Sequence, residues 1–586
     1  MKKSRLLVSV LFFGVLIVSL APVNGWLDTS EMSAASHLLG IGHPPGQPLY
    51  SMIGKLFQFL PFGNLAFRSN VLSAVLLALS LFLFSGLCKI ILRECESKFY
   101  ISLAILIGLY FFLAYSFMIQ GTRAELYSLN LFLSILVLYC LVDEKYFAGG
   151  FFLIGLSLGC HPLLGILLLP GLLVVTIGNK KGASAYLKGF LFLAVGASVY
   201  LYLPLRASSY SVYNFGNPDN LSAFLWVVTG ELYKAYGELS ASQVFTNAVN
   251  IIYIFMKQLH PVVFILSSAG ILFFIRSNFR SGIMLGVIML ANVSSLLLNM
   301  HFDMQNPDLH GYLLLSFVVL AIGFLFFTVI SAQGVRRYLR GRRLNGLAWS
   351  TLSLIILLAV IQVFRFFPSY ARGKDYSAYV FGRDVVSGLT YGSGVFAGSF
   401  STFSVLSYLN YAEKYRDDLG LLYAGFMENK GYKRTVAKNY PEFGSVMGDA
   451  GSGFRADILS RLKETGIPVF VELAIKKRGE TYSIRYPESI LEKLERHEWF
   501  FEYKESAGND YGAHYRKFMK EKIINRYVGA EKEFKRQILL GLFLHSRLFI
   551  YRGDYETAEY IIGEGLLLND LFGPFIFLKQ EIEDLR

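Results

Sequence analysis

The stretch Trp26-Leu27-Asp28-Thr29-Ser30-Glu31, followed by His43-Pro44-Pro45-Gly46-Gln47-Pro48, is a polar island in an otherwise apolar chain. The chain has 586 residues, of which 54% are hydrophobic, and its mean hydropathy is +0.47. Soluble domains are less apolar than this. About eleven apolar runs are long enough to cross a bilayer, and they begin near Leu6, Val71, Ile101, Leu126, Phe147, Leu163, Leu187, Pro261, Ile283, Tyr312 and Leu347. The sequence therefore predicts an α-helical polytopic membrane protein.

The basic residues indicate how this protein is oriented. The net charge is +13, and Lys and Arg gather in clusters that share one side of the membrane if the spans alternate. These clusters are Lys2, Lys3 and Arg5; Lys89, Arg93 and Lys98; Lys180, Lys181 and Lys188; Arg276 and Arg280; and Arg336, Arg337, Arg340, Arg342 and Arg343. The pattern predicts the cytoplasmic (inner) membrane, a cytoplasmic N-terminus and an extracytoplasmic C-terminal domain. The charge is then a topology signal and not a footprint for nucleic acid. Residues 1–25 also have the form of a secretory signal peptide, which leaves the sides unchanged.

The hydropathy divides the chain into three predicted domains. Residues 1–365 form a transmembrane domain, whose first external loop spans residues 21–70. Residues 366–500 form an exported α/β domain, and residues 501–586 form a helical region. No cysteine follows residue 365, so we expect no disulfide framework in the exported part; the four cysteines are Cys88, Cys95, Cys140 and Cys160.

Short patterns support the two exported domains. Gly394–Gly398 and Ile467–Leu473 read as buried strands, and Phe403–Glu413 reads as a helix between them. Ile538–Tyr551 and Arg552–Tyr560 have the pattern of one tetratricopeptide helix pair. Such repeats normally need about three copies for stability. The pair is therefore either a TPR-like recognition surface or a helical cap on the domain.

The predicted external segments of the membrane domain carry a set of ionisable residues that includes all of the candidate site residues. These residues are Asp28, Glu31, His43, Arg123, Glu125, His161, Arg206, Asp219, Asp303 and Asp308. The middles of the spans carry almost no ionisable residue, whereas a coupled transporter usually places charges near the bilayer midplane. This distribution favours an enzyme that works at the outer membrane surface.

The polar island has two readings. Asp28 and Glu31 are three residues apart, so they project from the same side of a helix. They match either a capping box, with Asp28 as the N-cap, or a catalytic pair. The two prolines after His43 hold it outside a helix, either as a structural or as a functional residue. Pro48–Ile53 then resembles the start of an interfacial helix.

Four further candidates lie in later external segments. Arg123 and Glu125 form either a surface ion pair of little worth or part of a site. Arg206 can snorkel to the interface or grip a lipid phosphate with two parallel hydrogen bonds. His161, followed by a proline between two apolar runs, is the last of them. Their convergence on one face carries more weight than any single residue.

The motifs resemble a family of uncharacterised bacterial membrane proteins, whose animal members are protein O-mannosyltransferases acting on IPT domains of plexins and receptor kinases. The resemblance covers roughly residues 20–420 and is carried by Asp28-x-x-Glu31, His43-Pro44-Pro45-Gly46-x-Pro48-Leu49-Tyr50, Arg68-x-Asn70-x-x-Ser73, Ala124-Glu125-Leu126-Tyr127-x-Leu129-Asn130, Gly155-Leu156-Ser157-Leu158-Gly159-x-His161, Leu203-Pro204-x-Arg206 and Asn214-Phe215-Gly216-Asn217-Pro218. The chain departs from the family at Cys160, Phe215 and Asn217, and in the turn Ala397–Phe400.

The resemblance implies a glycosyltransferase of the GT-C superfamily that moves a sugar, mannose by analogy, from a polyprenyl-phosphate carrier to a hydroxyl of an exported protein or glycan. It implies an inverting reaction in which Asp28 is the general base, helped by Glu31. Cationic or polar groups would hold the donor phosphate and substrate, namely His43, Arg123, Glu125, His161 and Arg206. No metal constellation is expected from the spacing of the ligands, and no cofactor, although a loop-bound divalent ion stays open. The alternatives are a transporter of lipids or lipid-linked polymers and a non-catalytic membrane scaffold.

Overall fold

The computed structural model describes residues 2–93, 98–177, 181–209, 211–236, 239–336, 342–427, 429–443, 459, 462–473, 475–478, 481–484, 491–492, 494–497, 499–503, 532–568 and 573–585. The chain divides into two compact units. We call them the membrane unit (Met1–Ala21, Pro44–Leu205 and Leu225–Gly373) and the α/β unit (Pro22–His43, Arg206–Phe224 and Lys374–Arg586).

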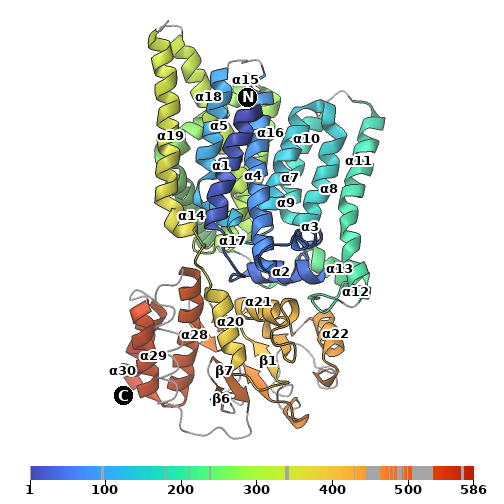
Figure 1. Ribbon diagram of the computed structural model, residues 1–586, viewed down its shortest axis with the longest axis vertical. Coiled ribbons are helices and arrows are strands. Elements are labelled where there is room, and N and C mark those ends of the chain that lie inside the picture. Colours follow the sequence, from blue (N-terminus) through green and yellow to red (C-terminus); the bar gives the residue numbers. More distant parts are fainter. Residues whose placement is uncertain are drawn as a thin grey trace. The chain divides into compact units, whose positions relative to one another are not determined.

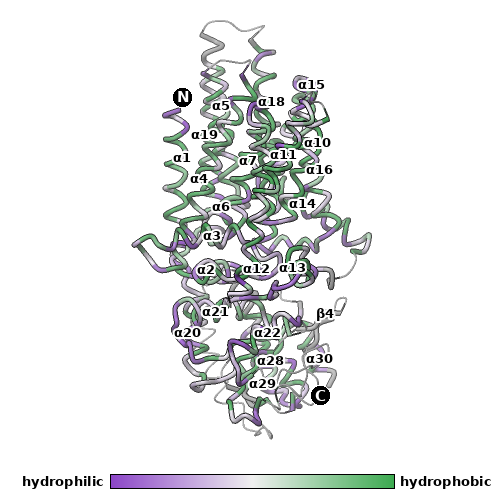
Figure 2. Tube along the Cα trace, turned by 90° about the vertical axis from the view of Figure 1, so that its right-hand side faces the viewer, coloured by the Kyte–Doolittle hydropathy of each residue, from purple (hydrophilic) through white to green (hydrophobic). Residues whose placement is uncertain are grey.

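Apolar helices build the membrane unit, as Figure 2 shows along α4, α5 and α18. By length and composition, five described segments can cross a membrane: α4 (Leu65–Ile91), the continuous run Ala183–Ser208, α16 (Phe279–Asn299), α18 (Leu314–Arg336) and α19 (Arg342–Tyr370). The run Ala183–Ser208 joins α11 (Ala183–Ala197), η2 (Ser198–Leu201) and α12 (Tyr202–Ser208). Two bent pairs raise the number of candidate spans to seven: α5 (Lys98–Phe112) with α6 (Tyr115–Gly121), and α14 (Ala241–Leu259) with α15 (Pro261–Ser277).

Shorter helices complete this unit. They are α1 (Lys2–Ser19), α3 (Pro48–Gln58), α7 (Tyr127–Val142), η1 (Glu144–Tyr146), α8 (Phe147–Cys160), α9 (Pro162–Ile166), α10 (Leu169–Ile177), η3 (Glu231–Tyr236) and α17 (Pro307–Tyr312), while α13 (Leu221–Val228) crosses a unit boundary. Each of the eleven predicted apolar runs contains a helix, so the helical membrane class is confirmed. The number of crossings stays a prediction, because several of these helices are shorter than the roughly 20 residues that a bilayer requires.

Glycines let pairs of membrane helices approach closely. A Cβ atom on Gly155 of α8 would lie 2.4 Å from the carbonyl oxygen of Leu193 in α11. A Cβ atom on Gly270 of α15 would lie 1.8 Å from the carbonyl oxygen of Gly323 in α18. Small residues at helix contacts replace the hydrophobic driving force that is missing inside a bilayer. The contacts of α8 with α11 and of α15 with α18 are therefore set by backbone packing.

The α/β unit contains a five-stranded sheet with the strand order β2-β1-β3-β7-β6. The parallel strands are β1 (Gly394–Ala397), β2 (Gly420–Tyr423) and β3 (Val469–Val471), and the antiparallel strands are β6 (Leu494–His497) and β7 (Phe500–Tyr503). The hairpin β4 (Ile475–Arg478) and β5 (Thr481–Ile484) forms a second sheet. The two predicted strands are confirmed, since they contain β1 and β3, which are buried throughout.

Helices accompany this sheet (Figure 1). They are α20 (Ser377–Ser387), α21 (Phe400–Ser407) with a π-helical extension η4 (Tyr408–Ala412), η5 (Ala424–Phe426), α22 (Lys430–Asn439), α28 (Lys532–Tyr551), α29 (Tyr555–Leu568) and α30 (Gly573–Leu585). The predicted helix over Phe403–Glu413 is thereby confirmed, as is the helical nature of the C-terminal region where it is described. Residues 504–531 lie outside the described residues, and the TPR-like assignment stays a prediction.

The α/β unit is assembled from three separate parts of the sequence. α2 (Asp28–Leu38) lies against α21 and η4 (Figure 1). The chain after α2 pairs with the segment from the second part, because Ile41 forms a parallel bridge with Asn214. The predicted domains, 1–365, 366–500 and 501–586, follow the order of the chain. The compact units do not, since the first external loop divides between them after His43.

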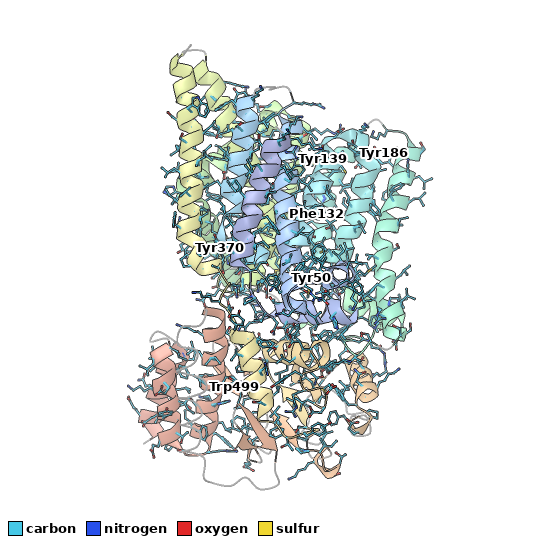
Figure 3. All side chains as sticks on the ribbon, in the orientation of Figure 1. Tyr50, Phe132, Tyr139, Tyr186, Tyr370 and Trp499 are labelled. Atoms are coloured by element: carbon cyan, nitrogen blue, oxygen red, sulfur yellow. The ribbon has the colours of Figure 1, made fainter. Side chains whose placement is uncertain are left out.

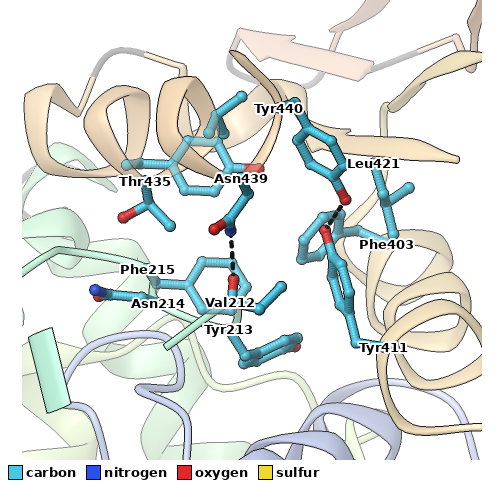
Figure 4. A pocket seen from close by; sticks show the side chains of 12 residues that line it. Val212, Tyr213, Asn214, Phe215, Phe403, Tyr411, Leu421, Thr435, Asn439 and Tyr440 are labelled. Carbon is cyan, nitrogen blue, oxygen red and sulfur yellow. Dashed lines mark hydrogen bonds between the residues drawn. The ribbon is translucent and has the colours of Figure 1, made fainter. Parts of the chain in front are cut away.

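Aromatic packing fixes the second part, Arg206–Phe224, in this unit. The Phe215 ring contacts the rings of Phe403, Phe426 and Tyr432 at centroid distances of 5.5, 4.9 and 6.0 Å. Figure 4 shows the neighbouring contact, in which the Asn439 side chain donates a hydrogen bond of 2.8 Å to the carbonyl oxygen of Val212. The cavity among these residues measures about 20 Å³, enough for roughly one water molecule. This region is therefore a packed contact.

Candidate active site

Asp28, Glu31 and His43 meet at the start of α2, within the α/β unit. The Glu31 carboxylate holds His43 twice: one oxygen accepts the backbone N–H of His43 at 2.6 Å, and the other lies 2.5 Å from Nδ1 of the ring. The opposite ring nitrogen, Nε2, lies 3.8 Å from a carboxylate oxygen of Asp28. The side chains of Glu31, His43 and Asp28 are 0, 12 and 25% exposed. Asp28 therefore offers the accessible carboxylate, with His43 and then Glu31 behind it.

The local fold explains this arrangement. α2 begins at Asp28, so both carboxylates lie in its first turn, where the helix dipole favours negative charge. The backbone N–H of Glu31 donates to the hydroxyl of Ser404 in α21 at 2.8 Å. The prolines place His43 in a bend outside any helix, as predicted. Its ring also meets the Phe400 ring edge-on, with the centroids 5.4 Å apart. Contacts from α21 thus fix both partners of Asp28.

The capping-box interpretation is wrong. The residue before the helix is Leu27, and it makes no side-chain capping bond, while Asp28 is already the first helical residue. Glu31 cannot close a capping box because its two oxygens are directed to His43. The predicted helix at Pro48 exists as α3, with Pro48 in its first turn.

Arg206 stabilises the other end of α2. Its Nε donates to the carbonyl oxygen of Leu39 at 2.6 Å, and one terminal nitrogen donates to that of Leu38 at 3.1 Å. The last carbonyl groups of a helix lack internal partners, and a cation there complements the helix dipole. Arg206 therefore positions α2, which the sequence did not reveal because the two segments are more than 160 residues apart.

Tyr213 is a neighbour of the carboxylates that the sequence analysis missed. Its backbone carbonyl accepts the N–H of Ile41 at 2.7 Å, and its ring is fully buried. Burial, and to a lesser degree the negative charges of Glu31 and Asp28, raise the pKa of the Tyr213 hydroxyl well above its ordinary value of 10.0. The hydroxyl is therefore neutral at physiological pH. Its place directly before the Asn214–Pro218 motif was the available signal.

The same three residues can hold a metal ion. One ligand atom each from Asp28, Glu31 and His43 lies within 4.8 Å of the others. Carboxylate oxygens and an imidazole nitrogen suit divalent cations such as Mg²⁺, Mn²⁺ or Zn²⁺. The prediction that the ligands lack metal spacing is thus wrong, because the turn after α2 folds His43 back over twelve residues. The two contacts between Glu31 and His43 do not themselves require an ion.

A second charged cluster lies in the membrane unit. Arg123 forms an ion pair with Asp308 at the start of α17, and another of its nitrogens lies 3.7 Å from a carboxylate oxygen of Glu125. Arg123 and Glu125 are 2 and 1% exposed, so the surface-pair alternative is wrong. Breaking a buried ion pair typically costs about 3–5 kcal/mol. The cluster therefore joins the turn after α6 to α17. The sequence analysis placed Asp308 on the outer face, but nothing in the sequence pairs it with Arg123.

His161 lies at another place in the membrane unit. Its Nε2 is 3.1 Å from the hydroxyl of Tyr312, and the two rings meet edge-on with centroids 5.5 Å apart. Tyr312 in turn contacts the ring of Tyr127. The structure thus groups the seven predicted site residues into Asp28, Glu31, His43 and Arg206 of the α/β unit, and Arg123, Glu125 and His161 of the membrane unit.

Comparisons with known proteins identify relatives of this chain. Residues 28–184 match a family described as the N-terminal domain of the protein O-mannosyl-transferase TMEM260. Protein O-mannosyl-transferase TMEM260 from Mus musculus is 29% identical over 233 residues, covering 37% of this chain and 32% of the mouse protein. The crystal structure of ArnT from Cupriavidus metallidurans in the apo state shares the fold, with a TM-score of 0.50 at 13% identity over 82% of this chain and 96% of ArnT.

The chain is thus similar in sequence to the protein O-mannosyl-transferase TMEM260 and in fold to ArnT. A second ArnT structure, bound to undecaprenyl phosphate, aligns with a TM-score of 0.49 at 13% identity over 82% of this chain and 97% of that one. The chain spans about a third of the length of the mouse relative. Together with the apolar helices, the likeness identifies a multi-pass membrane protein.

The match to the O-mannosyltransferase family begins at Asp28 itself. Arg206 lies beyond its end at residue 184, whereas five other candidates lie within it: Glu31, His43, Arg123, Glu125 and His161. The predicted resemblance is therefore confirmed.

Proposed function

We propose that this protein is a membrane glycosyltransferase that moves mannose from a polyprenyl-phosphate carrier to a hydroxyl of an exported protein or glycan. One observation carries the proposal: the partly exposed Asp28 carboxylate is backed by His43 and by the fully buried Glu31. A base must reach its substrate and must also be held still. Asp28 meets both requirements, and the family match begins at this residue.

In the proposed reaction the acceptor hydroxyl attacks the anomeric carbon of the donor sugar. The new C–O bond forms as the bond between that carbon and the phosphate oxygen breaks, and the polyprenyl phosphate leaves with the electron pair. The Asp28 carboxylate accepts the hydroxyl proton. Attack opposite the leaving group inverts the anomeric centre. Glu31 orients the His43 ring, which directs Nε2 toward Asp28 and fixes the approach of the acceptor.

The leaving phosphate needs positive charge or hydrogen-bond donors. His43, Arg206, Arg123 and His161 remain the proposed groups, with Glu125 as a further contact to the substrate. Arg123 already pairs with two carboxylates and Arg206 with two carbonyl groups. For these two arginines we therefore propose a positioning role and no direct contact with the phosphate. A divalent cation held by Asp28, Glu31 and His43 would supply additional positive charge.

The proposed reaction takes place at the outer face of the cytoplasmic (inner) membrane. The basic clusters support a cytoplasmic N-terminus and an extracytoplasmic C-terminal domain. A polyprenyl carrier then presents its sugar to the compartment that contains the exported acceptor.

The test uses membranes that contain the full chain and are supplied with polyprenyl-phosphate mannose and exported proteins. Asp28→Asn should lower transfer by about 10²–10⁴-fold, because it removes the base and keeps the size of the side chain. Asp219→Asn is the control, since this exposed carboxylate belongs to the same unit and pairs with Arg434 at the surface. Full activity of Asp28→Asn would remove the assigned base, and the absence of transfer by the unaltered chain would remove the function.

A further inference from the structure

A cavity of about 210 Å³ in the α/β unit is not used by the proposed reaction. It lies at the carboxyl ends of β1 and β3, where Gly398 and Ser399 follow one strand and Glu472 follows the other. β1 has β2 as its neighbour on one side and β3 as its neighbour on the other, so the chain connections from β1 diverge here. In open parallel sheets, ligands bind in the crevice at such a switch point. The position of this cavity is thus one that α/β domains use for binding.

The polar groups at the base of the cavity already satisfy one another. One oxygen of Glu472 accepts the backbone N–H groups of Gly398 and Ser399 at 2.8 and 3.0 Å. The other accepts the Thr402 hydroxyl at 2.7 Å and the indole N–H of Trp499 at 3.0 Å. A carboxylate has about four lone-pair sites, and these four bonds fill them. A ligand in this cavity must therefore be recognised by its apolar surface.

The walls supply such a surface. Trp26, Phe381 and Trp499 line the cavity together with aliphatic side chains of α28, including Leu544 (Trp499 is labelled in Figure 3). The indole N–H of Trp26 donates to the Ser377 hydroxyl at 3.1 Å, and its ring packs against that of Phe381 with the centroids 5.1 Å apart. An apolar cavity of about 150 Å³ is known to bind benzene. The present cavity is large enough for one aromatic or branched aliphatic side chain.

The cavity is connected to the proposed base by the chain itself. Trp26 lines the cavity, and Asp28 follows two residues later. Two extended residues span at most about 7 Å. The Cα atoms of Trp26 and Asp28 therefore lie within about 7 Å of each other, a distance that a few residues of an extended polypeptide can span.

We propose that this cavity anchors an aromatic or branched aliphatic side chain of an exported acceptor polypeptide, a few residues from the hydroxyl that receives the sugar. This inference rests on the proposed function, because that function supplies the identity of the ligand. It adds that the amino-acid sequence around the acceptor hydroxyl matters. The binding of a peptide can be measured without the donor, so the two proposals fail separately.

The test uses the full chain in detergent and three acetylated hexapeptides that share one threonine and carry Phe, Ala or Gln three residues from it. Isothermal titration calorimetry measures binding, and transfer from polyprenyl-phosphate mannose measures kcat/KM. Filling an apolar pocket with a larger side chain is worth about 10–200-fold in discrimination. We expect the Phe peptide to bind at least about tenfold more tightly than the Ala and Gln peptides. Equal binding of the three peptides would overturn the proposal.

Two variants of α28 connect the binding to the cavity. Leu544→Trp fills the space and should abolish the preference for Phe, whereas Leu544→Ala enlarges it and should shift the preference toward a Trp peptide. Tyr551→Trp on the same helix is the control, because it adds bulk at a position that is 42% exposed and away from the cavity. An unchanged preference in both Leu544 variants contradicts the proposal. Asp28→Asn should bind the Phe peptide normally but not glycosylate it, which separates anchoring from chemistry.

Discussion

Leu27 connects the two halves of the proposed acceptor site. Its backbone has φ 58° and ψ −134°, a combination that residues other than glycine rarely adopt. Conformations of this kind cost about 1–3 kcal/mol each and persist where the surroundings enforce them. Here the neighbours on both sides are fixed, since Trp26 is hydrogen-bonded to Ser377 and Asp28 begins α2. The strained residue thus sets the direction in which Asp28 enters the helix.

A pair of substitutions measures this strain. Leu27→Gly and Leu27→Ala both remove the side chain, but only glycine tolerates the backbone angles. Glycine normally destabilises a position by about 0.5–1 kcal/mol relative to alanine. At Leu27 we expect the reverse, with the glycine variant unfolding at a higher temperature than the alanine variant. Thermal unfolding of the two purified proteins decides this, and a more stable alanine variant would show that the backbone is relaxed.

Glu31 is proposed to act through His43 and not on the substrate. Glu31→Gln replaces one of the oxygens that hold His43 with an NH₂ group, so the ring can turn away from Asp28. A displacement of about 1 Å at a reacting group costs on the order of 10²-fold in rate. We therefore expect kcat to fall by about that factor with little change in the KM for the acceptor, and the pH profile of kcat to change shape. Asp417→Asn, at an exposed carboxylate of the same unit, should alter neither.

At the scale of elements, buried polar contacts join pieces that are distant in sequence. Arg206 completes the C-terminal end of α2, and Glu472 joins the end of β3 to the start of α21. Desolvation raises the pKa of the Glu472 carboxyl above its ordinary value of 4.5, although its four hydrogen bonds oppose this. The carboxylate occupies the N-terminal end of α21, where an anion is stabilised by backbone N–H groups. These contacts explain how strands of only three or four residues hold their partners in place.

Glu472 makes stability depend on pH. Since its pKa is raised in the folded protein, the folded state keeps a proton that the unfolded state has lost at pH values above 4.5. The free energy of unfolding should therefore fall as the pH rises through this interval and level off above the folded pKa. Glu472→Gln should remove this slope and, at neutral pH, destabilise the protein by about 1–3 kcal/mol, because its NH₂ group faces hydrogen-bond donors. Thermal unfolding between pH 4 and 8 measures both effects, with the exposed Glu464→Gln as the control.

At the scale of the whole molecule, a membrane unit and an α/β unit share one chain whose polypeptide passes repeatedly from one unit to the other. From the positive-inside pattern we predict that the α/β unit lies outside the cytoplasm. The α/β unit contains no cysteine. All four cysteines, Cys88, Cys95, Cys140 and Cys160, lie in the membrane unit. Cysteine labelling can therefore report on the orientation without interference from native thiols in this unit.

A membrane-impermeant maleimide tests the orientation. Lys463→Cys places a thiol in the α/β unit, and intact cells should label it because this unit is expected outside the cytoplasm. The native Cys95, in a basic segment expected on the cytoplasmic side, should react only after the cells are permeabilised. Labelling in the opposite order would invert the assignment.

The sequence predicted the class of the fold and the main carboxylates for identifiable reasons. Apolar runs are local signals, so the helices of the membrane unit and the strands β1 and β3 could be predicted. Asp28 and Glu31 were found because both lie in one short polar stretch. The partners Ser404, Tyr213 and Asp308 were not, since their contacts span from about 180 to 370 residues. Contacts between residues distant in sequence produce no periodic pattern in a single sequence. The α/β unit also has no cysteines whose pairing could have indicated such contacts.

The three-part origin of the α/β unit has a consequence for biosynthesis. A ribosome delivers Pro22–His43 first, Arg206–Phe224 about 160 residues later, and β1 only after α19. Until the final third of the chain has emerged, α2 has none of the contacts from α21 that fix Glu31 and the His43 ring. Chains whose synthesis is interrupted can thus insert their helices into the membrane without acquiring a formed site. The proposed site can therefore form only after α21 has been synthesised.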